Sequence, residues 1–250
     1  MRSIAIASIV LGCTFGAALA GIWCRSRLPE HHLDSESKDV VRIGMALIAT
    51  MAALILSLVI ASAKSAYDDQ ASAVRNLAAY ILTLDRTLAQ YGPETKPIRE
   101  LLRQTVAFRL EATWPSEGAP VAPAGNTVLA QNLEERILEM TPKNDAQRWL
   151  QSQALGLASD ALKTRWTAFA GAGNVVPAPF LVIVVFWLTA LFWSFGLFAP
   201  RNATVLSVLL LCALSVAAAV FLILEMESPF TGIMSISSAP LRYALALLGQ

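Results

Sequence analysis

Two uncharged apolar runs lie next to each other, at residues 178–199 and 203–224. Each has about 22 residues, and a helix rises 1.5 Å per residue, so each reaches roughly 33 Å and crosses the hydrocarbon core of a bilayer. Only Pro200, Arg201 and Asn202 join the two runs. So short a link permits only an antiparallel helical hairpin, and the chain is therefore predicted to be an integral membrane protein.

Two further segments, residues 4–23 and 43–63, are also apolar and flanked by basic residues, which gives four predicted spans. The first has a second interpretation, because Ala18-Leu19-Ala20 resembles the small-residue cleavage site of a secretory signal. Its apolar run is longer than the roughly 7–15 residues of a signal peptide, and basic residues follow at once. A retained span is therefore the favoured interpretation.

The composition agrees with a membrane protein and excludes several other classes. Charged residues are only 15% of the chain, against about 25% in an ordinary soluble domain. The net charge of +1 creates no field that would attract nucleic acid. Cys13, Cys24 and Cys212 form no Cys-x-x-Cys pair, so neither a zinc site nor a redox site is predicted.

The orientation of the spans is left open by the sequence. Four spans place both termini and residues 64–176 on one side of the membrane, and the two short loops on the other. Lys and Arg near the span ends divide almost evenly between these sides, so the positive-inside rule selects neither orientation.

Residues 64–176 are polar and have the apolar period of helices. One stripe at spacings of three and four contains Val74, Leu77, Ala78, Ile81, Leu84, Leu88 and Tyr91. Gly92-Pro93 is expected to end this helix, which continues the second span without a breaker. A second helix starts near Pro97, because proline is tolerated in a first turn.

Two more helices are predicted in this region, over residues 128–140 and after Thr141-Pro142, which look like an N-cap and a first-turn proline. The predicted fold class is therefore all-α, with four transmembrane helices and a helical-bundle insert between spans two and three. The predicted domains are residues 1–63, 64–176, 177–224 and 225–250. Ser238 is expected to begin a short amphipathic helix in the last of them.

We find no catalytic constellation, no cofactor motif and no metal set. His31-His32 with Asp34, Glu36 and Asp39 has metal-ligand residue types, but adjacent histidines point apart and no i+4 ligand matches them. Both histidines lie in one loop, so a histidine-activated nucleophile is not expected. The spans also contain no Asp, Glu, His, Lys or Arg, which argues against a proton-coupled pump.

The hairpin turn and the end of the last span carry the charges that most need an explanation. Asn202 is placed to N-cap the last span, and Arg201 to reach the interface. Glu225 and Glu227 follow at a helix C-terminus, where the helix dipole disfavours negative charge. We expect a basic residue of the insert to compensate one of them, and Arg99 and Arg103 are the candidates.

Several segments together resemble one known family. They include residues 195–203 and 224–232, Leu84-Asp85-Arg86, and residues 91–94 with the arginines that follow. They are similar to a family of bacterial integral-membrane proteins called bestrophin-like, which has no established activity. The residues that we predict to matter for function or structure are Asp85, Tyr91, Gly92, Pro93, Glu94, Arg99, Arg103, Arg201, Asn202, Glu225, Glu227, Ser228, Pro229, Phe230 and Gly232.

Bestrophins are pentameric anion channels with four spans and a helical cytosolic region between spans two and three. The resemblance implies a multi-pass, homo-oligomeric protein of the cell inner membrane, whose second span lines a pore. Candidate constriction residues are then Met45, Leu47, Met51 and Leu54. The alternative is a non-catalytic membrane scaffold or stress-response partner whose helical insert binds another protein. In both cases the expected contacts are the lipid bilayer and protein, without nucleic acid or cofactor.

Overall fold

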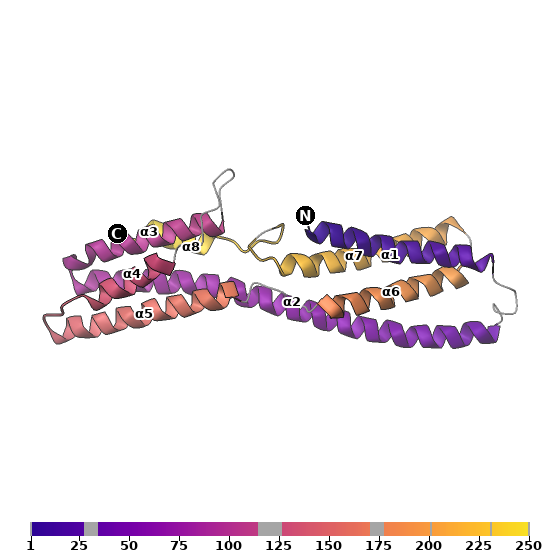
Figure 1. Ribbon diagram of the computed structural model, residues 1–250, viewed down its shortest axis with the longest axis horizontal. Coiled ribbons are helices and arrows are strands. Elements are labelled where there is room, and N and C mark those ends of the chain that lie inside the picture. The colour runs from indigo at the N-terminus through magenta and orange to yellow at the C-terminus, as the bar shows by residue number, and fades with distance from the viewer. Residues whose placement is uncertain are drawn as a thin grey trace. The chain divides into compact units, whose positions relative to one another are not determined.

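The computed structural model describes residues 2–27, 35–114, 127–170, 178–200, 202–230 and 232–249, and all regular structure in these residues is helical (Figure 1). The elements are α1 (Arg2–Arg25), α2 (Ser35–Tyr91), the 3₁₀ turn η2 (Pro93–Thr95), α3 (Lys96–Thr113), α4 (Thr127–Leu138), α5 (Asp145–Ala170), α6 (Ala178–Phe198), α7 (Ala203–Met226) and α8 (Ala239–Leu247). The predicted all-α class is confirmed.

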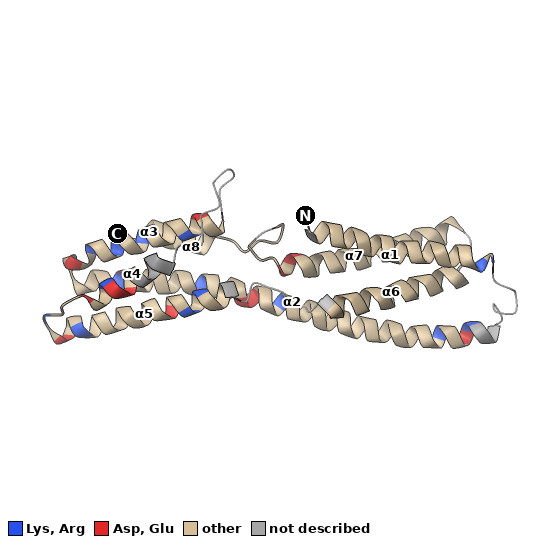
Figure 2. Cartoon of the chain, viewed as in Figure 1, with Lys and Arg blue, Asp and Glu red and all other residues tan. Residues whose placement is uncertain are grey.

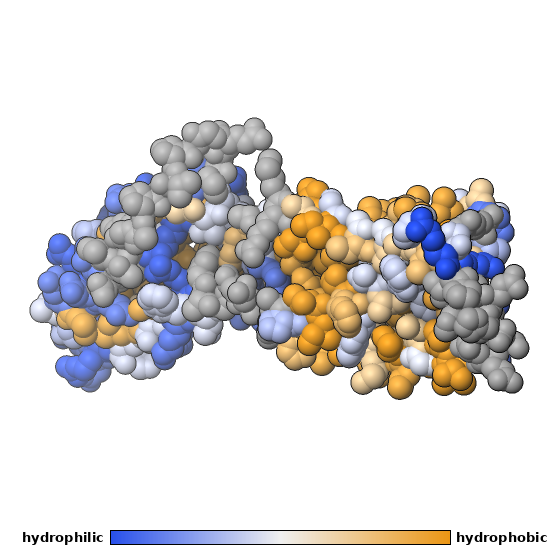
Figure 3. Space-filling view, turned by 45° about the vertical axis from the view of Figure 1, so that its right-hand side comes forward, coloured by the Kyte–Doolittle hydropathy of each residue, from blue (hydrophilic) through white to orange (hydrophobic). Residues whose placement is uncertain are grey.

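The chain forms two compact units. Unit 1 contains α1, the first part of α2, α6 and α7, together with residues 232–234. Unit 2 contains the rest of α2, then α3, α4, α5, residues 229–231 and the tail from Ser235. Charged side chains are concentrated on the helices of unit 2 (Figure 2), and apolar surface covers the helices of unit 1 (Figure 3).

Within the described residues, four helices are long and apolar enough to cross a membrane, namely α1, α2, α6 and α7. This confirms the four predicted spans. The last one runs to Met226, two residues beyond the predicted limit, so that Glu225 lies in its final turn.

Helices α1 and α6 approach each other closely at small residues. A Cβ atom at Gly196 would collide with the backbone oxygen of Ala18, and one at Gly21 with the backbone of Trp193. Such small residues let the backbones of membrane helices meet. Ala18 is fully buried in a cluster that includes Ala213 of α7. Helix α1 is thus an integral part of a bundle with α6 and α7.

Helix α2 is one continuous helix of 57 residues, roughly 85 Å long at 1.5 Å per residue. The predicted continuation beyond Ala63 is confirmed. Only 11% of its most apolar window is buried, against 28% in each of the other three membrane helices. Five large apolar residues, each 47–72% exposed, form what we call the α2 stripe: Ile43, Leu47, Met51, Leu54 and Leu58.

In unit 2, α3 packs against α4 and α8, and α4 packs against α5. The apolar stripe that was predicted on α2 supplies much of its core, including the buried Val74, Leu84 and Leu88. Gln151 of α5 holds the end of α4, because its Nε2 donates to the carbonyls of Ile137 and Met140 at 2.8 and 2.9 Å.

The predicted start of α5 at Thr141-Pro142 is wrong. The helix begins at Asp145, and Asn144 provides the cap by accepting a hydrogen bond from the backbone N–H of Gln147 at 2.8 Å. Asparagine is a stronger N-cap than threonine, so the helix starts at the better of two available signals. The join between α5 and α6 lies outside the described residues, as do His31, His32 and Asp34 of the first loop.

Candidate functional site

The turn between α2 and α3 contains three of the predicted residues, Gly92, Pro93 and Glu94, and reverses the chain. Gly92 has a φ of 146°, a conformation that favours glycine, and Pro93 opens η2 directly after it. The buried Thr95 closes the turn, because its hydroxyl donates to the carbonyls of Leu88 and Gly92 at 2.6 and 2.8 Å. The predicted helix stop at Gly92-Pro93 is therefore confirmed.

Asp85 and Arg99 form a two-pronged ion pair across this turn. Nε and Nη2 of Arg99 each donate to a different carboxylate oxygen of Asp85 at 2.7 Å. Asp85 is only 4% exposed, and its hydrogen bond raises the pKa of the Arg99 guanidinium. Because removal of one partner leaves a buried charge without this counter-charge, the pair fixes α3 to α2.

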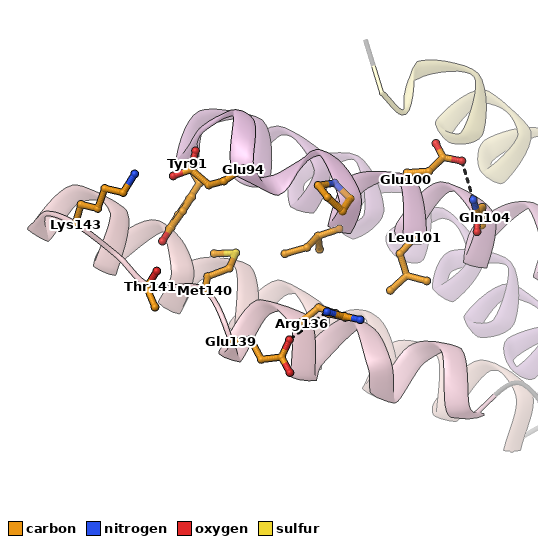
Figure 4. Close-up of a pocket in the computed structure, with 12 residues that line it drawn as sticks. Tyr91, Glu94, Glu100, Leu101, Gln104, Arg136, Glu139, Met140, Thr141 and Lys143 are labelled. Carbon is orange, nitrogen blue, oxygen red and sulfur yellow. Dashed lines mark hydrogen bonds and ion pairs between the residues drawn. The ribbon is translucent and has the colours of Figure 1, made fainter.

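A groove of about 710 Å³ lies beside the turn (Figure 4). Tyr91 is at one end, with its ring pointing toward Thr141 of the α4–α5 link. The charged residues that line the groove are Glu94, Glu100, Arg136, Glu139 and Lys143.

Several of these charged side chains already have hydrogen-bond partners, and Arg136 pairs with Glu139 at 3.4 Å. Arg103 donates two hydrogen bonds of 2.9 Å to Glu100, and Gln104 donates a third. These donors lower the pKa of the exposed Glu100 carboxyl to about 2. Gln147 joins α5 to the turn that follows α2, since its Nε2 donates hydrogen bonds to the Tyr91 carbonyl and to the Glu94 carboxylate. The groove therefore presents both charge signs, which suits a polar partner better than a small apolar ligand.

The end of α7 shows how Glu225 is accommodated. Glu225 is 5% exposed, and its Oε2 accepts a hydrogen bond of 2.8 Å from the backbone N–H of Ile233. Gly232 has a φ of 92°, and a Cβ atom there would collide with the Glu225 carboxylate. The compensation for Glu225 is thus a backbone amide. Arg99 and Arg103, the candidates for compensating Glu225 or Glu227, donate hydrogen bonds to Asp85 and Glu100.

The segment after α7 is held to the end of α3. Phe230 packs edge-on against Trp114, with ring centroids 5.6 Å apart. The indole N–H of Trp114 donates to the carbonyl of Ile236 at 2.8 Å, and the N–H of Ile236 donates to the carbonyl of Pro229 at 2.7 Å. These contacts give Pro229 and Phe230 a structural role, and Ser228 marks the point at which the chain leaves α7.

At the hairpin turn, the predicted cap is confirmed. The side-chain oxygen of Asn202 accepts a hydrogen bond of 2.8 Å from the backbone N–H of Val205. Arg201 lies outside the described residues. The C-terminal end of α1 contacts the end of α6 just before this turn. There the guanidinium of Arg25 donates a hydrogen bond to the carbonyl of Ala199.

The family model for the Bestrophin-like domain matches residues 12–241, nearly the whole chain. The chain belongs to the bestrophin-like family. The match includes part of α1, all of α2, α6 and α7, and the buried carboxylates Asp85 and Glu225. No curated protein and no solved structure matches the chain in the corresponding searches.

The structure separates the candidate constriction residues of this bestrophin-like chain. Leu47, Met51 and Leu54 lie on the exposed α2 stripe. Met45 instead lines a groove of about 700 Å³ together with Ser194 of α6 and Val208 of α7. Three of the four residues therefore share a face, and Met45 lies on a different one.

Sequence reasoning missed three residues that shape these sites, namely Thr95, Trp114 and Gln147. Each acts through a hydrogen bond to the backbone of another element or turn. The signal available for Trp114 was a large aromatic residue at the end of a helix, before a loop rich in proline and glycine. Nothing local in the sequence identifies Thr95 or Gln147.

Proposed function

We propose that this chain forms a homo-oligomeric, anion-conducting channel in the inner membrane of a bacterium, with no catalytic activity. Membership of the bestrophin-like family supports a membrane protein of this architecture. Residues 64–176 would form its water-exposed helical insert, on the same side as both termini. The dense charge on the helices of unit 2 favours this assignment.

The observation that carries the proposal is the exposed α2 stripe. Helices α1, α6 and α7 bury their small residues against one another, whereas Ile43, Leu54 and Leu58 of α2 are each at least 67% exposed. Other copies of α2 around a central axis would cover or face this stripe. An uncharged ring of large apolar residues is a constriction of the kind that gates by dewetting.

The absence of charged residues from residues 4–23, 43–63, 178–199 and 203–224 is compatible with anion conduction. Helix N-termini and backbone N–H groups attract anions without cationic side chains. The same absence disfavours proton-coupled transport, which uses ionisable groups at membrane depth.

Currents from the purified full chain in planar bilayers test this function. We expect an anion-selective current that Leu54→Asp reduces strongly, because a ring of carboxylates repels anions at a constriction. Leu211→Asp is the matched control, since Leu211 is a 64% exposed leucine on α7. A stable oligomer without current, or equal effects of the two substitutions, would contradict the proposal.

One observation favours the alternative, a scaffold whose insert binds another protein. Trp149 of α5 is 63% exposed in a unit with a charged surface, and tryptophan is enriched among residues that dominate protein interfaces. A scaffold predicts that a specific membrane-extracted partner is lost in Trp149→Ala and in a Glu94/Lys143 double alanine variant. Asp85 and Tyr91 are buried. Substitutions at these two positions would therefore report on folding and not on partner binding.

A further inference from the structure

A second cavity lies in the core of unit 2 and has about 330 Å³ of space. It is partly open and is lined by side chains from five helices, including Leu84 of α2, Leu102 of α3, Leu162 of α5 and Leu241 of α8. Its volume falls at the low end of the roughly 300–1,000 Å³ that ligand pockets occupy. The lining is mainly apolar, so the cavity suits a molecule with an apolar body.

Two arginines from different helices line this apolar space. Arg109 comes from α3 and Arg165 from α5. Among the described residues of the lining, Glu134 of α4 is the one carboxylate. Burial, and then repulsion from Arg165, lower the pKa of the Arg109 guanidinium to about 10.

Arg165 has an unused hydrogen-bond donor here. Its Nη1 atom is buried, and no described residue accepts a hydrogen bond from it. The ring of Trp166 lies 5.7 Å from the guanidinium, which is a cation–π contact and leaves the N–H unsatisfied. Buried polar groups normally have partners, so an acceptor beyond the described residues is expected here.

We propose that this cavity binds a single-chain amphiphilic carboxylate, with its headgroup at Arg109 and Arg165 and its apolar chain among the leucines. A guanidinium binds a carboxylate through two parallel hydrogen bonds, which would satisfy Nη1 of Arg165. A small inorganic anion would leave the apolar space empty, and a neutral amphiphile would leave Nη1 without an acceptor. The site is separate from the α2 stripe and does not depend on channel activity.

Binding of decanoate to the full chain in lipid nanodiscs tests this proposal. Labelled decanoate is measured by equilibrium dialysis, and its uptake by empty nanodiscs is subtracted to remove partition into lipid. We expect saturable binding of one decanoate per chain. Decanol, which lacks the charge, and acetate, which lacks the chain, are expected to show no saturable binding.

Three variants separate the headgroup contact from general effects. Arg165→Gln is expected to weaken decanoate binding about tenfold or more, the loss of a charge-assisted hydrogen bond pair. Ala161→Leu fills the lining while keeping both arginines, and it is expected to abolish binding. Arg148→Gln is the matched control, because Arg148 is an exposed arginine on the same helix.

Removal of one of two mutually repelling cations should also leave the thermal stability of ligand-free Arg165→Gln unchanged or raised. If this variant does not fold, Ala161→Leu decides between the outcomes. No saturable decanoate binding, equal binding of decanol, or binding that survives both Arg165→Gln and Ala161→Leu would overturn the proposal.

Discussion

In the bundle of α1, α6 and α7, small residues lie between the helices, whereas in the membrane segment of α2 large apolar residues face outward. Ala18 and Ala213 are fully buried, and Gly21 and Gly196 bring two backbones together. Leu47 and Leu54 of α2 are 63% and 72% exposed. The three bundle helices pack on one another through these small residues, and 28% of the most apolar window of each is buried, against 11% for α2. The α2 stripe is therefore the less covered surface, and it is available for lipid or for other copies of the chain.

The largest effect is expected from breaking the close contact of the bundle. Gly21→Leu places a side chain where the α6 backbone lies, and no change of side-chain rotamer relieves that clash. We expect a loss of about 3 kcal/mol or more, at or above the usual cost of overpacking. Unfolding in mixed micelles, followed by circular dichroism, measures it.

Gly12→Leu is the matched control, because it lies on the same helix with nothing within 4 Å of its Cβ position. A similar loss of stability in both variants would show that α1 is not packed against α6 as described.

The second effect concerns the end of the bundle, where Gly232 allows the chain to reach Glu225. Gly232→Ala adds left-handed backbone strain of about 1–2 kcal/mol and a clash with the Glu225 carboxylate. Gly249→Ala has nearly the same φ, 88° against 92°, but no neighbour within 4 Å. Chemical denaturation should therefore show a larger loss for Gly232→Ala. Equal losses would mean that the Glu225 contact adds nothing beyond backbone strain.

The third effect is on assembly rather than on the stability of one chain. Leu47→Ala with Leu54→Ala shortens two residues of the α2 stripe and should change subunit stability by less than about 0.5 kcal/mol per residue. The oligomeric fraction, measured by light scattering, is expected to fall. The same pair of changes at Leu211 and Leu214, which are exposed on α7, should leave it unchanged. An equal fall in both variants would remove the distinction between α2 and the bundle.

The smallest effect is on the pH dependence of unit 2. The pKa of Glu100 is lowered from its ordinary value near 4.5 to about 2 by donors from Arg103 and Gln104. Its contribution to stability is therefore complete above pH 4.5, and it is lost as the pH falls through about 2. An NMR titration of the Glu100 carboxyl should give a midpoint near 2 that rises in Arg103→Gln. A midpoint that Arg103→Gln does not move would exclude this ion pair.

Features that depend on neighbouring residues in the chain were predictable. The apolar runs gave the membrane helices, Gly92-Pro93 ended α2, and Asn202 capped α7. At α5 two caps competed within a few residues, and the pattern of Thr141-Pro142 obscured the stronger Asn144.

Features that depend on distant residues were not predictable in the same way. Asp85 and Arg99 were both singled out, but their pairing requires the chain reversal at Gly92. Glu225 was recognised as needing compensation, yet its partner is a backbone N–H with no sequence signature. The cavity between Arg109 and Arg165 forms only when α3 and α5 pack in one unit.

We propose that the exposed membrane segment of α2 marks a protein that assembles with copies of itself. The mass of the complex released from membranes in native-like lipid particles tests this assembly. We expect a discrete homo-oligomer, and a pentamer would match the bestrophin architecture. A species with the mass of a single chain, at every protein concentration measured, would contradict it.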